Sequence, residues 1–266
     1  MDFGLRGRVA IVCAASRGLG KATASSLARE GTHVVLSSRD SVGLDAAANE
    51  IRAATADSSV RILPVTADLT RPEQIRTLVA RAMTEFGRVD ILITNAGGPP
   101  VATFPELDDP TWERGIGLTL MSVIRCVREV LPIMQKQRWG RIVNITSISA
   151  RQPIDDLIVS STLRPGILGL AKVLANQYTR DGILVNNVTP GYILTDRQKE
   201  IGAARAGKKG VPYEQYMQDL VRDVPAGRLG TPAELADVVV FLCSERAGYV
   251  SGATVSVDGG MAKGLF

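Results

Sequence analysis

A run of small residues and glycines, V-C-A-A-S-R-G-L-G, follows the first apolar stretch of the chain. Glycines at such a strand-to-helix turn let main-chain N–H groups approach a diphosphate at the start of the helix. A methyl group at Ala14, where a turn of this kind usually has glycine, restricts the turn if a positive φ is needed there. A tight turn without a ligand is the alternative interpretation. The residues expected around a diphosphate are Ala14, Ser16, Arg17, Gly18, Leu19 and Gly20.

Ser38 and Arg39 end the next apolar stretch, where a protein that binds NAD(H) would place an acidic residue on the ribose hydroxyls. The forked guanidinium group of arginine matches the geometry of a phosphate. Arg17 and Arg39 together could therefore hold a 2′-phosphate. This pattern favours NADP(H) over NAD(H) as the cofactor.

The elements that must position these residues are short apolar runs alternating with longer helical segments. This alternation predicts a single α/β domain over residues 1–266, with a doubly wound parallel sheet of about seven strands and helices on both faces, a Rossmann-type fold. The expected strands are Val9–Cys13, Val34–Ser37, Ile62–Val65, Ile91–Thr94, Ile142–Ile145, Val185–Val188 and Thr254–Val257. The expected helices are Leu19–Glu30, Leu44–Thr55, Pro72–Phe86, Thr111–Gln137, Gly166–Arg180 and Pro232–Ser244.

Residues 196–223 interrupt this alternation, and we call them the lid segment. The segment follows the sixth expected strand, on the carboxyl side of the sheet where ligands bind in such folds. Its position favours a mobile cover over a substrate, and a solvated helical insertion is the alternative. Its first half contains the basic residues Arg197, Lys199, Arg205, Lys208 and Lys209.

Composition excludes several other classes of protein. Aromatic residues are 5% of the chain and the net charge is only +4, which gives no platform for stacking nucleic-acid bases. No metal site is expected, because His33 is the only histidine and the cysteines Cys13, Cys126 and Cys243 lie far apart. No signal peptide or stretch of transmembrane length is expected. A cytoplasmic protein with reduced, buried thiols follows from this pattern.

Taken together, the motifs resemble those of the short-chain dehydrogenase/reductase family, and the likeness covers nearly the whole chain. It includes T-N-A-G at Thr94–Gly97, G-R-I-V-N-I-T-S at Gly140–Ser147, N-N-V-T-P-G at Asn186–Gly191, P-A-G-R-L-G-T-P at Pro225–Pro232 and V-S-V-D-G-G at Val255–Gly260. The resemblance implies NAD(P) binding, oxidoreductase activity and a homo-oligomer, either a tetramer or a dimer. The most similar branch is that of the 3-oxoacyl carrier-protein reductases.

The resemblance also implies roles for further residues. Asp68 and Leu69 would flank the adenine, and Asn95, Ala96 and Gly97 would line the cofactor cleft. By the same likeness, the residues near the nicotinamide carboxamide would be Pro190, Gly191 and Thr195.

The catalytic positions of the family are mostly changed in this chain. Family members usually carry Asn, Ser, Tyr and Lys, and the corresponding positions here are Thr119, Ser147, Ser160 and Arg164. Serine is a poor substitute for a tyrosine whose pKa is lowered by a neighbouring lysine. Arg164 could still hold a ribose hydroxyl or a phosphate, but it stays protonated. Tyr192 is a possible substitute donor.

Pro165 makes a helical conformation unfavourable at Arg164 and lacks an N–H group of its own. We therefore expect the helix to begin near Ser161–Leu163, with Pro165 in its first turn. A cap role for Ser160 and an exposed or ion-paired Arg164 remain alternatives to a catalytic role, and main-chain bonding remains one for Ser147.

Three functions remain open at this stage. The first is an NADPH-dependent reductase with an altered proton donor: Ser147 with a water, Tyr192, or an acidic group of the substrate. The second is a cofactor-binding pseudoenzyme or sensor, and the third is an oligomeric scaffold that binds no nucleotide. The expected substrate is a small molecule or a carrier-bound acyl group, since the basic lid residues could meet an acyl carrier protein or a coenzyme A phosphate.

Overall fold

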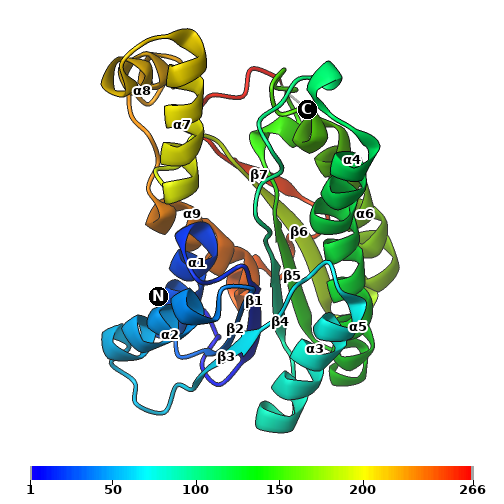
Figure 1. The fold of residues 1–266 in the computed structure, drawn as a ribbon. Helices are drawn as coiled ribbons and strands as arrows, with labels where there is room; N and C mark the ends of the chain where they lie inside the picture. The colour runs from blue at the N-terminus through cyan, green and yellow to red at the C-terminus, as the bar shows by residue number, and fades with distance from the viewer. Residues whose placement is uncertain (1, 265–266) are drawn as a thin grey trace.

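A computed structural model describes residues 2–264 of the chain, which form a seven-stranded parallel sheet (Figure 1). The strand order is β3-β2-β1-β4-β5-β6-β7, and every neighbouring pair is parallel. The strands are β1 (Val9–Cys13), β2 (His33–Ser38), β3 (Ile62–Thr66), β4 (Ile91–Thr94), β5 (Gly140–Ile145), β6 (Ile183–Pro190) and β7 (Thr254–Val257). The order reverses direction between β1 and β4, so the carboxyl ends of these two strands open a crevice at the sheet edge.

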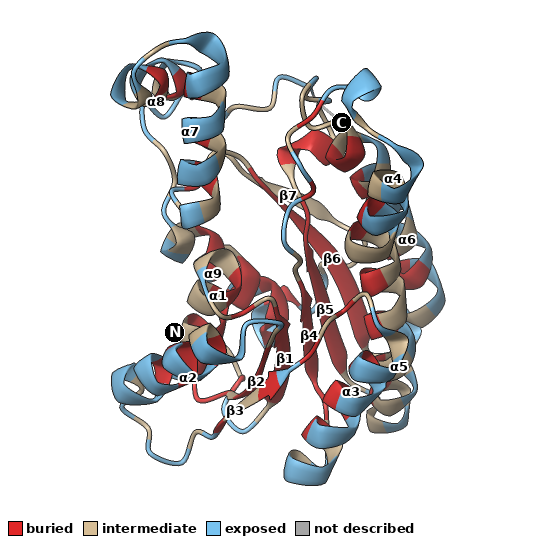
Figure 2. Ribbon diagram, in the orientation of Figure 1, coloured by how far each residue is buried: buried red, intermediate tan, exposed pale blue. Residues whose placement is uncertain are grey.

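Helices cover both faces of the sheet, as the alternation of elements predicts (Figure 1). The helices on one face are α1 (Gly18–Arg29), α2 (Ser41–Ala54) and α9 (Pro232–Cys243). Those on the other are α3 (Pro72–Phe86), α5 (Ser122–Gln137) and α6 (Ile158–Tyr178), with the short α4 (Asp109–Gly115) above them. Figure 2 shows that the inner strands β1, β2, β4, β5 and β6 are almost entirely buried, whereas the edge strands β3 and β7 are partly exposed. The Rossmann-type fold class is therefore confirmed.

All seven expected strands are present, and their observed bounds differ from the expected ones by two residues at most. The sequence predicts one helix over 111–137, but the structure divides this segment into three helical stretches. It consists of α4, a π-helical stretch at Ile116–Met121, and α5. A π-helical turn shifts the register of the side chains that follow it, and neither composition nor apolar spacing identifies it in advance.

The expected start of α6 near Ser161–Leu163 is wrong. The helix begins at Ile158 and runs through Pro165, which lies in its interior rather than in its first turn. The buried positions Ser160, Arg164, Ile167, Ala171 and Leu174 recur every three or four residues and form one continuous inner face. Packing of that face against the sheet outweighs the local cost of the proline, which is about 3 kcal/mol in a helix interior.

The same helix corrects the expectation about transmembrane length. The segment Ile158–Asp181 is long and apolar enough to span a membrane, with a mean hydropathy of 1.3. Its inner face nevertheless packs in the hydrophobic core beneath the sheet, through Ile167 and Ala171. The core helix of a globular protein passes the same test of length and composition as a membrane span, and 39% of this window is buried.

A ladder of polar side chains crosses the sheet near its carboxyl edge. Thr94 Oγ1 donates to Asn144 Oδ1 at 2.7 Å, and Asn144 Nδ2 donates to Asn187 Oδ1 at 2.9 Å. Asn187 Nδ2 continues the ladder to Thr254 Oγ1 at 3.2 Å. Buried polar groups that are all paired in this way hold neighbouring strands in one register. The ladder therefore fixes the strand ends that carry the site.

The lid segment consists of two helices, α7 (Asp196–Lys209) and α8 (Tyr213–Arg222), which project from the carboxyl side of the sheet (Figure 1). Gly210 joins them with a φ of 66°, a conformation that favours glycine. Ala206, Tyr216 and Leu220 form a small hydrophobic core between the two helices. This core is separate from the two large ones on the faces of the sheet.

Candidate functional site

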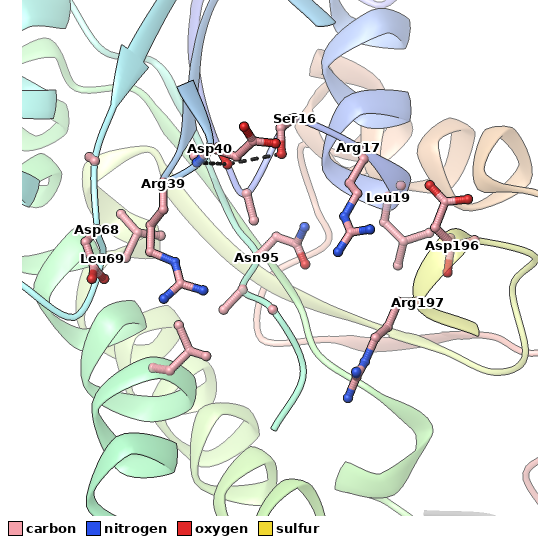
Figure 3. A pocket seen from close by; sticks show the side chains of 18 residues that line it. Ser16, Arg17, Leu19, Arg39, Asp40, Asp68, Leu69, Asn95, Asp196 and Arg197 are labelled. Atoms are coloured by element: carbon pink, nitrogen blue, oxygen red, sulfur yellow. Dashed lines mark hydrogen bonds between the residues drawn. The ribbon is translucent and has the colours of Figure 1, made fainter. Parts of the chain in front are cut away.

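A cleft of about 430 Å³ opens at the carboxyl ends of β1, β2, β3 and β4 (Figure 3). It lies at the reversal point of the strand order, where open α/β sheets bind their ligands. Residues from the glycine turn, the end of β2, the end of β3, the end of β4 and the start of α7 line it. The lining residues that the sequence analysis assigned to the cofactor are Ala14, Ser16, Arg17, Gly18, Leu19, Ser38, Arg39, Asp68, Leu69, Asn95, Ala96, Gly97 and Thr195.

The glycine turn has the geometry that close approach of a diphosphate requires. Gly18 has a φ of 59°, and α1 begins there without a side-chain cap, so its first N–H groups are open to the cleft. A Cβ atom at Gly20 would lie 2.3 Å from the carbonyl oxygen of Ala14, so only glycine lets α1 pack this closely on the turn. Ala14 itself adopts a φ of 49°, which costs an alanine roughly 1–2 kcal/mol.

The two arginines expected to hold a 2′-phosphate differ in their surroundings. Arg39 lines the cleft beside Asp68. Arg17 also lines the cleft, but its Nη1 lies 3.1 Å from Glu200 Oε1 on α7. Ser38 Oγ donates to Ser16 Oγ at 3.0 Å, which ties the end of β2 to the glycine turn (Figure 3). The position of Arg39 fits the expectation directly, whereas Arg17 is engaged by the lid segment.

Asp68 is held in its charged form at the cleft wall. Burial alone would raise the pKa of its carboxyl group, but hydrogen bonds from Thr70 and the nearby charge of Arg39 lower that pKa overall. Thr70 N and Oγ1 both donate to Asp68 Oδ1, at 2.9 and 2.8 Å. The carboxylate therefore presents a fixed acceptor to a ligand in this part of the cleft.

Four of the expected cofactor residues are not among the described residues that line the cleft. Gly20 lies in α1, and Pro190 and Gly191 lie at the end of β6, where Gly191 N donates to Val257 O at 3.0 Å. The fourth, Arg164, lies in α6 beneath the end of β5. Thr195 does line the cleft and caps α7 by accepting from Gln198 N at 3.2 Å.

Five other residues line the cleft outside the expected cofactor set: Asp40, Ala67, Leu118, Asp196 and Arg197, of which only Arg197 was named from the sequence, as a basic residue of the lid segment. Ala67 and Asp196 each adjoin an expected residue, so chain adjacency could have identified them. Asp40 follows Arg39, and its carboxylate caps α2 by accepting from Gly43 N at 3.0 Å. The positions of Leu118 and Arg197 depend on the π-helical stretch and on the docking of α7, which the sequence pattern does not reveal.

Three serine hydroxyls lie around the turn that follows β5. Ser147 caps this turn by accepting from Ser149 N at 3.1 Å, so its own proton remains available to donate. Ser149 Oγ and Ser160 Oγ lie 2.8 Å apart, and both residues are buried. Ser160 is therefore not a helix cap, because it belongs to the inner face of α6 and bonds a second serine.

Arg164 is buried, with 8% of its surface exposed. Its Nη1 donates to Thr146 O at 2.5 Å and to Ile145 O at 3.4 Å, and its Nε is buried without a partner. Burial lowers the pKa of its guanidinium group to about 10. The alternative of an exposed or ion-paired Arg164 is wrong. The charge is sequestered at the end of β5 and bonded only to neutral main-chain oxygens.

Thr119 lies inside the π-helical stretch, and its hydroxyl oxygen is buried without a partner in the described part of the chain. π-Helical turns occur frequently at functional sites because they redirect side chains. Thr119 and Arg164 thus both present buried polar atoms that protein groups leave unsatisfied. Such atoms mark a place where a ligand or ordered water completes the hydrogen bonding.

Tyr192 packs with the lid segment, against the hydrophobic core made by Ala206, Tyr216 and Leu220. Burial raises the pKa of its hydroxyl group, although the charge of Arg205 acts in the opposite direction. A raised pKa makes a tyrosine a weaker proton donor near neutral pH. The environment of Tyr192 therefore fits lid packing better than proton transfer.

The lid segment is attached to both walls of the site. Arg197 Nη2 donates to Pro99 O at 2.8 Å on the loop after β4. Arg205 forms a bidentate salt bridge with Asp156, just before α6, at 2.7 and 2.5 Å. Pro99 and Asp156 belong to segments that also join each other, because Ala102 N donates to Asp156 O at 2.8 Å. Helix α7 thus completes a ring of contacts around the opening of the cleft.

Most of the basic lid residues have partners within the chain. Lys199 lies 3.7 Å from Asp196 and Lys208 lies 3.3 Å from Glu106, while the ammonium group of Lys209 lies over the ring of Tyr216. Arg205 is paired with Asp156. These internal pairs weaken the charge argument for an acidic carrier protein, because little of the positive charge is left for an external partner.

Comparison with known proteins identifies relatives along the whole chain. The family model described as Enoyl-(Acyl carrier protein) reductase matches residues 13–262. The chain is 34% identical to the D-beta-hydroxybutyrate dehydrogenase of Cupriavidus necator over 257 residues, covering 96% of this chain and 98% of the relative. It is 33% identical to the 3-oxoacyl-[acyl-carrier-protein] reductase FabG of Escherichia coli, covering 98% and 99%.

Solved structures of similar proteins match the fold closely. The crystal structure of L-sorbose reductase from Gluconobacter frateurii, complexed with NADPH and L-sorbose, superposes with a TM-score of 0.94. The two sequences are 34% identical, and the match covers 100% of both chains. A polyketide ketoreductase of actinorhodin, solved with NADPH, matches with a TM-score of 0.92 at 31% identity over 97% of this chain.

Proposed function

Because the chain belongs to the short-chain dehydrogenase/reductase family and has the scaffold of an oxidoreductase acting on carbonyl or hydroxyl groups, we propose that it is an NADPH-dependent carbonyl reductase. The cleft at the reversal point of the sheet is the observation that carries this proposal. It brings the glycine turn, Arg39 and Asn95 to one cavity from three separate strand ends. That arrangement matches the needs of an extended phosphorylated dinucleotide.

The residues of the cleft fit NADP(H) on structural grounds. Open N–H groups at the start of α1 suit the diphosphate, and the space secured by Gly20 allows it to approach. Arg39 suits the 2′-phosphate, because its guanidinium lines the cleft and forms no salt bridge in the described part of the chain, although the carboxylate of Asp68 lies near it. The proteins superposed above with NADPH support the same choice. When bound, NADPH supplies the hydride that reduces a carbonyl carbon.

This chain must deliver a proton without the usual tyrosine. We choose Ser147 among the candidates, since its hydroxyl accepts from Ser149 N and keeps its own proton free. Ser160 is bonded to Ser149 in the buried layer behind Ser147 and supports the turn rather than the substrate. Ser147 would orient the substrate carbonyl and donate its hydroxyl proton, which ordered water then replaces. This arrangement keeps part of the turnover rate of a complete acid–base set. We expect turnover roughly 10²–10⁴-fold below that of a complete acid–base set.

The substrate that we propose is a 3-oxoacyl-like carbonyl compound. The named relatives act on 3-oxoacyl, 3-hydroxybutyrate and sorbose substrates, so the reacting carbon is a ketone or a secondary alcohol in each. The internal pairing of the basic lid residues favours a small free substrate over a carrier-bound one. A cytoplasmic homo-oligomer, a dimer or a tetramer, completes the proposal.

The test separates cofactor binding from turnover. NADPH fluorescence titration of the purified protein should give saturable binding, and a panel of 3-oxo esters should be reduced above the buffer rate. Ser147→Ala should lower kcat while leaving the NADPH Kd unchanged. The matched control is Ser161→Ala, whose hydroxyl bonds the main chain of Ile154 instead. Absence of saturable NADPH binding would refute the proposal.

A second candidate is an NADP(H)-binding protein without turnover. The observation that favours it is the burial of Ser160 against Ser149, which leaves no ionisable hydroxyl at the family's tyrosine position. Tight NADPH binding, with no reduction of any carbonyl in the panel, would support this candidate. New turnover in the double variant Ser160→Tyr, Arg164→Lys would strengthen it further, because only the proton donor would then have been missing.

A further inference from the structure

Arg197 is the basic residue of the lid segment that faces the cleft (Figure 3). Its Nη2 donates to the neutral carbonyl oxygen of Pro99 at 2.8 Å. Its Nε is buried and has no partner in the described part of the chain. A Cβ atom on Gly98 would lie 3.3 Å from that Nε, so the missing side chain of Gly98 makes room for the guanidinium group. The guanidinium is thus held by main chain in a cradle beside the cleft.

The charge of Arg197 is not neutralised by a close carboxylate. The nearest is that of Glu200, where Oε2 lies 3.7 Å from Arg197 Nη1, beyond hydrogen-bonding distance. Glu200 uses its other oxygen, Oε1, for Arg17 at 3.1 Å. Arg205 and Lys208, on the same helix, make closer pairs with Asp156 and Glu106. Arg197 therefore has one long ion pair, with Glu200, and keeps its Nη1 group free of hydrogen bonds at the cleft wall.

The location of Arg197 points to the substrate rather than to the cofactor diphosphate. Its guanidinium group bonds the loop after β4, and the carboxylate of Glu200 lies between it and Arg17 of the glycine turn. That loop leads from Pro99 to Ala102, which bonds the segment just before α6. Helix α6 carries Ser160, which contacts Ser149 in the turn capped by Ser147. Arg197 is thus linked, through this loop and the segment before α6, to the part of the molecule that carries the serine turn.

We propose that Arg197 binds an acidic group, a carboxylate or a phosphate, on the carbonyl substrate of this protein. This inference rests on the proposed reductase function and narrows its substrate to a small oxo acid or its phosphorylated equivalent. Guanidinium groups pair with both kinds of anion through charge-assisted hydrogen bonds. Nη1 of Arg197 makes no hydrogen bond in the described part of the chain and belongs to a side chain that is 41% exposed, so it is the donor that such a contact would use.

The experiment measures binding without chemistry. Acetoacetate is titrated by calorimetry into protein saturated with NADP⁺, which cannot reduce it, and into protein without cofactor. Methyl acetoacetate, which lacks the charge, serves as the matched ligand. The wild type should bind acetoacetate more tightly than the ester. Arg197→Met should weaken acetoacetate binding about 10- to 100-fold, the effect of losing a charged hydrogen bond, and leave the ester unchanged.

Arg222→Met is the control variant, because Arg222 is exposed on α8 and pairs with Asp219 away from the cleft. It should leave the affinities for both ligands unchanged. Equal binding of acid and ester by the wild type would overturn the inference, as would an Arg197→Met variant that loses NADPH affinity instead of acetoacetate affinity. The latter result would assign Arg197 to the cofactor diphosphate. Both results leave the reductase proposal intact, which fails if the wild type binds no NADPH or reduces no carbonyl in the panel.

Discussion

At the scale of single residues, Arg164 poses the sharpest energetic question. Its charge is buried against two main-chain oxygens, with no carboxylate in contact. Burial lowers the pKa of the group to about 10, so at every lower pH the guanidinium stays charged in the folded state and carries its desolvation cost. Folding at neutral pH therefore pays a desolvation cost for Arg164. A cost of this kind is maintained at functional sites where a ligand uses the charge.

We predict that Arg164→Met stabilises the protein without cofactor by about 1–3 kcal/mol, because an apolar side chain removes the desolvation cost. The same variant should bind NADPH more weakly. Urea unfolding monitored by circular dichroism gives the first quantity, and fluorescence titration gives the second. Arg141→Met is the matched control. Arg141 is also buried, but it stacks on Trp139 and lies 3.6 Å from Glu245, so its loss should destabilise the fold. Loss of stability in both variants would contradict this account.

The sequence identified most cleft residues because their chemistry is local. Gly18, Arg39 and Asp68 each lie within five residues after the end of a strand, and the carboxyl ends of parallel strands meet at one edge. Residues whose role depends on the approach of distant segments were harder to identify. Arg197 reaches the cleft only because α7 docks on the loop after β4, and Ser160 meets Ser149 only because α6 begins before its proline.

At the scale of elements, the start of α6 and the docking of α7 decide the shape of the entrance. The conformational preferences around Pro165 predict that α6 begins after Ser160, since proline disfavours helical geometry at the residue before it. The continuous buried face from Ser160 to Leu174 overrides that rule. The lid segment is held over the entrance mainly by polar contacts, and its own core is small. Elements with few apolar contacts to the body open at low free-energy cost.

We predict that Asp156→Ala releases the lid segment. The bidentate contact with Arg205, whose side chain is 11% exposed, is the least solvated link between α7 and the body. Its loss should accelerate limited cleavage by trypsin after Lys208 and Lys209, identified by mass spectrometry. The global free energy of unfolding should change by only about 1–3 kcal/mol. Asp219→Ala breaks a pair within α8 instead, and should leave the cleavage rate at these lysines unaltered. Equal rates in Asp156→Ala and the wild type would show that other contacts hold the lid segment.

At the scale of the whole molecule, the cleft is lined by parts of the chain that belong to different packed units. Its walls come from β1, β2 and β3 on one side of the reversal point, from β4 on the other, and from α7 above. A ligand that contacts all of these must stabilise the native state as one unit. Binding to the native state alone adds about 2.7 kcal/mol when the ligand is at 100 times its Kd.

We therefore predict that NADPH raises the melting temperature more than NADH does at equal concentration. The difference arises at the 2′-phosphate, which Arg39 faces from the end of β2. Arg39→Ala should reduce the shift with NADPH to that with NADH, and should leave the NADH shift as in the wild type. Differential scanning fluorimetry over a concentration series measures both shifts. Arg76→Ala, exposed on α3 and outside the cleft lining, controls for loss of positive charge. Equal shifts with both cofactors in the wild type would assign the protein to NAD(H) and remove the role given to Arg39.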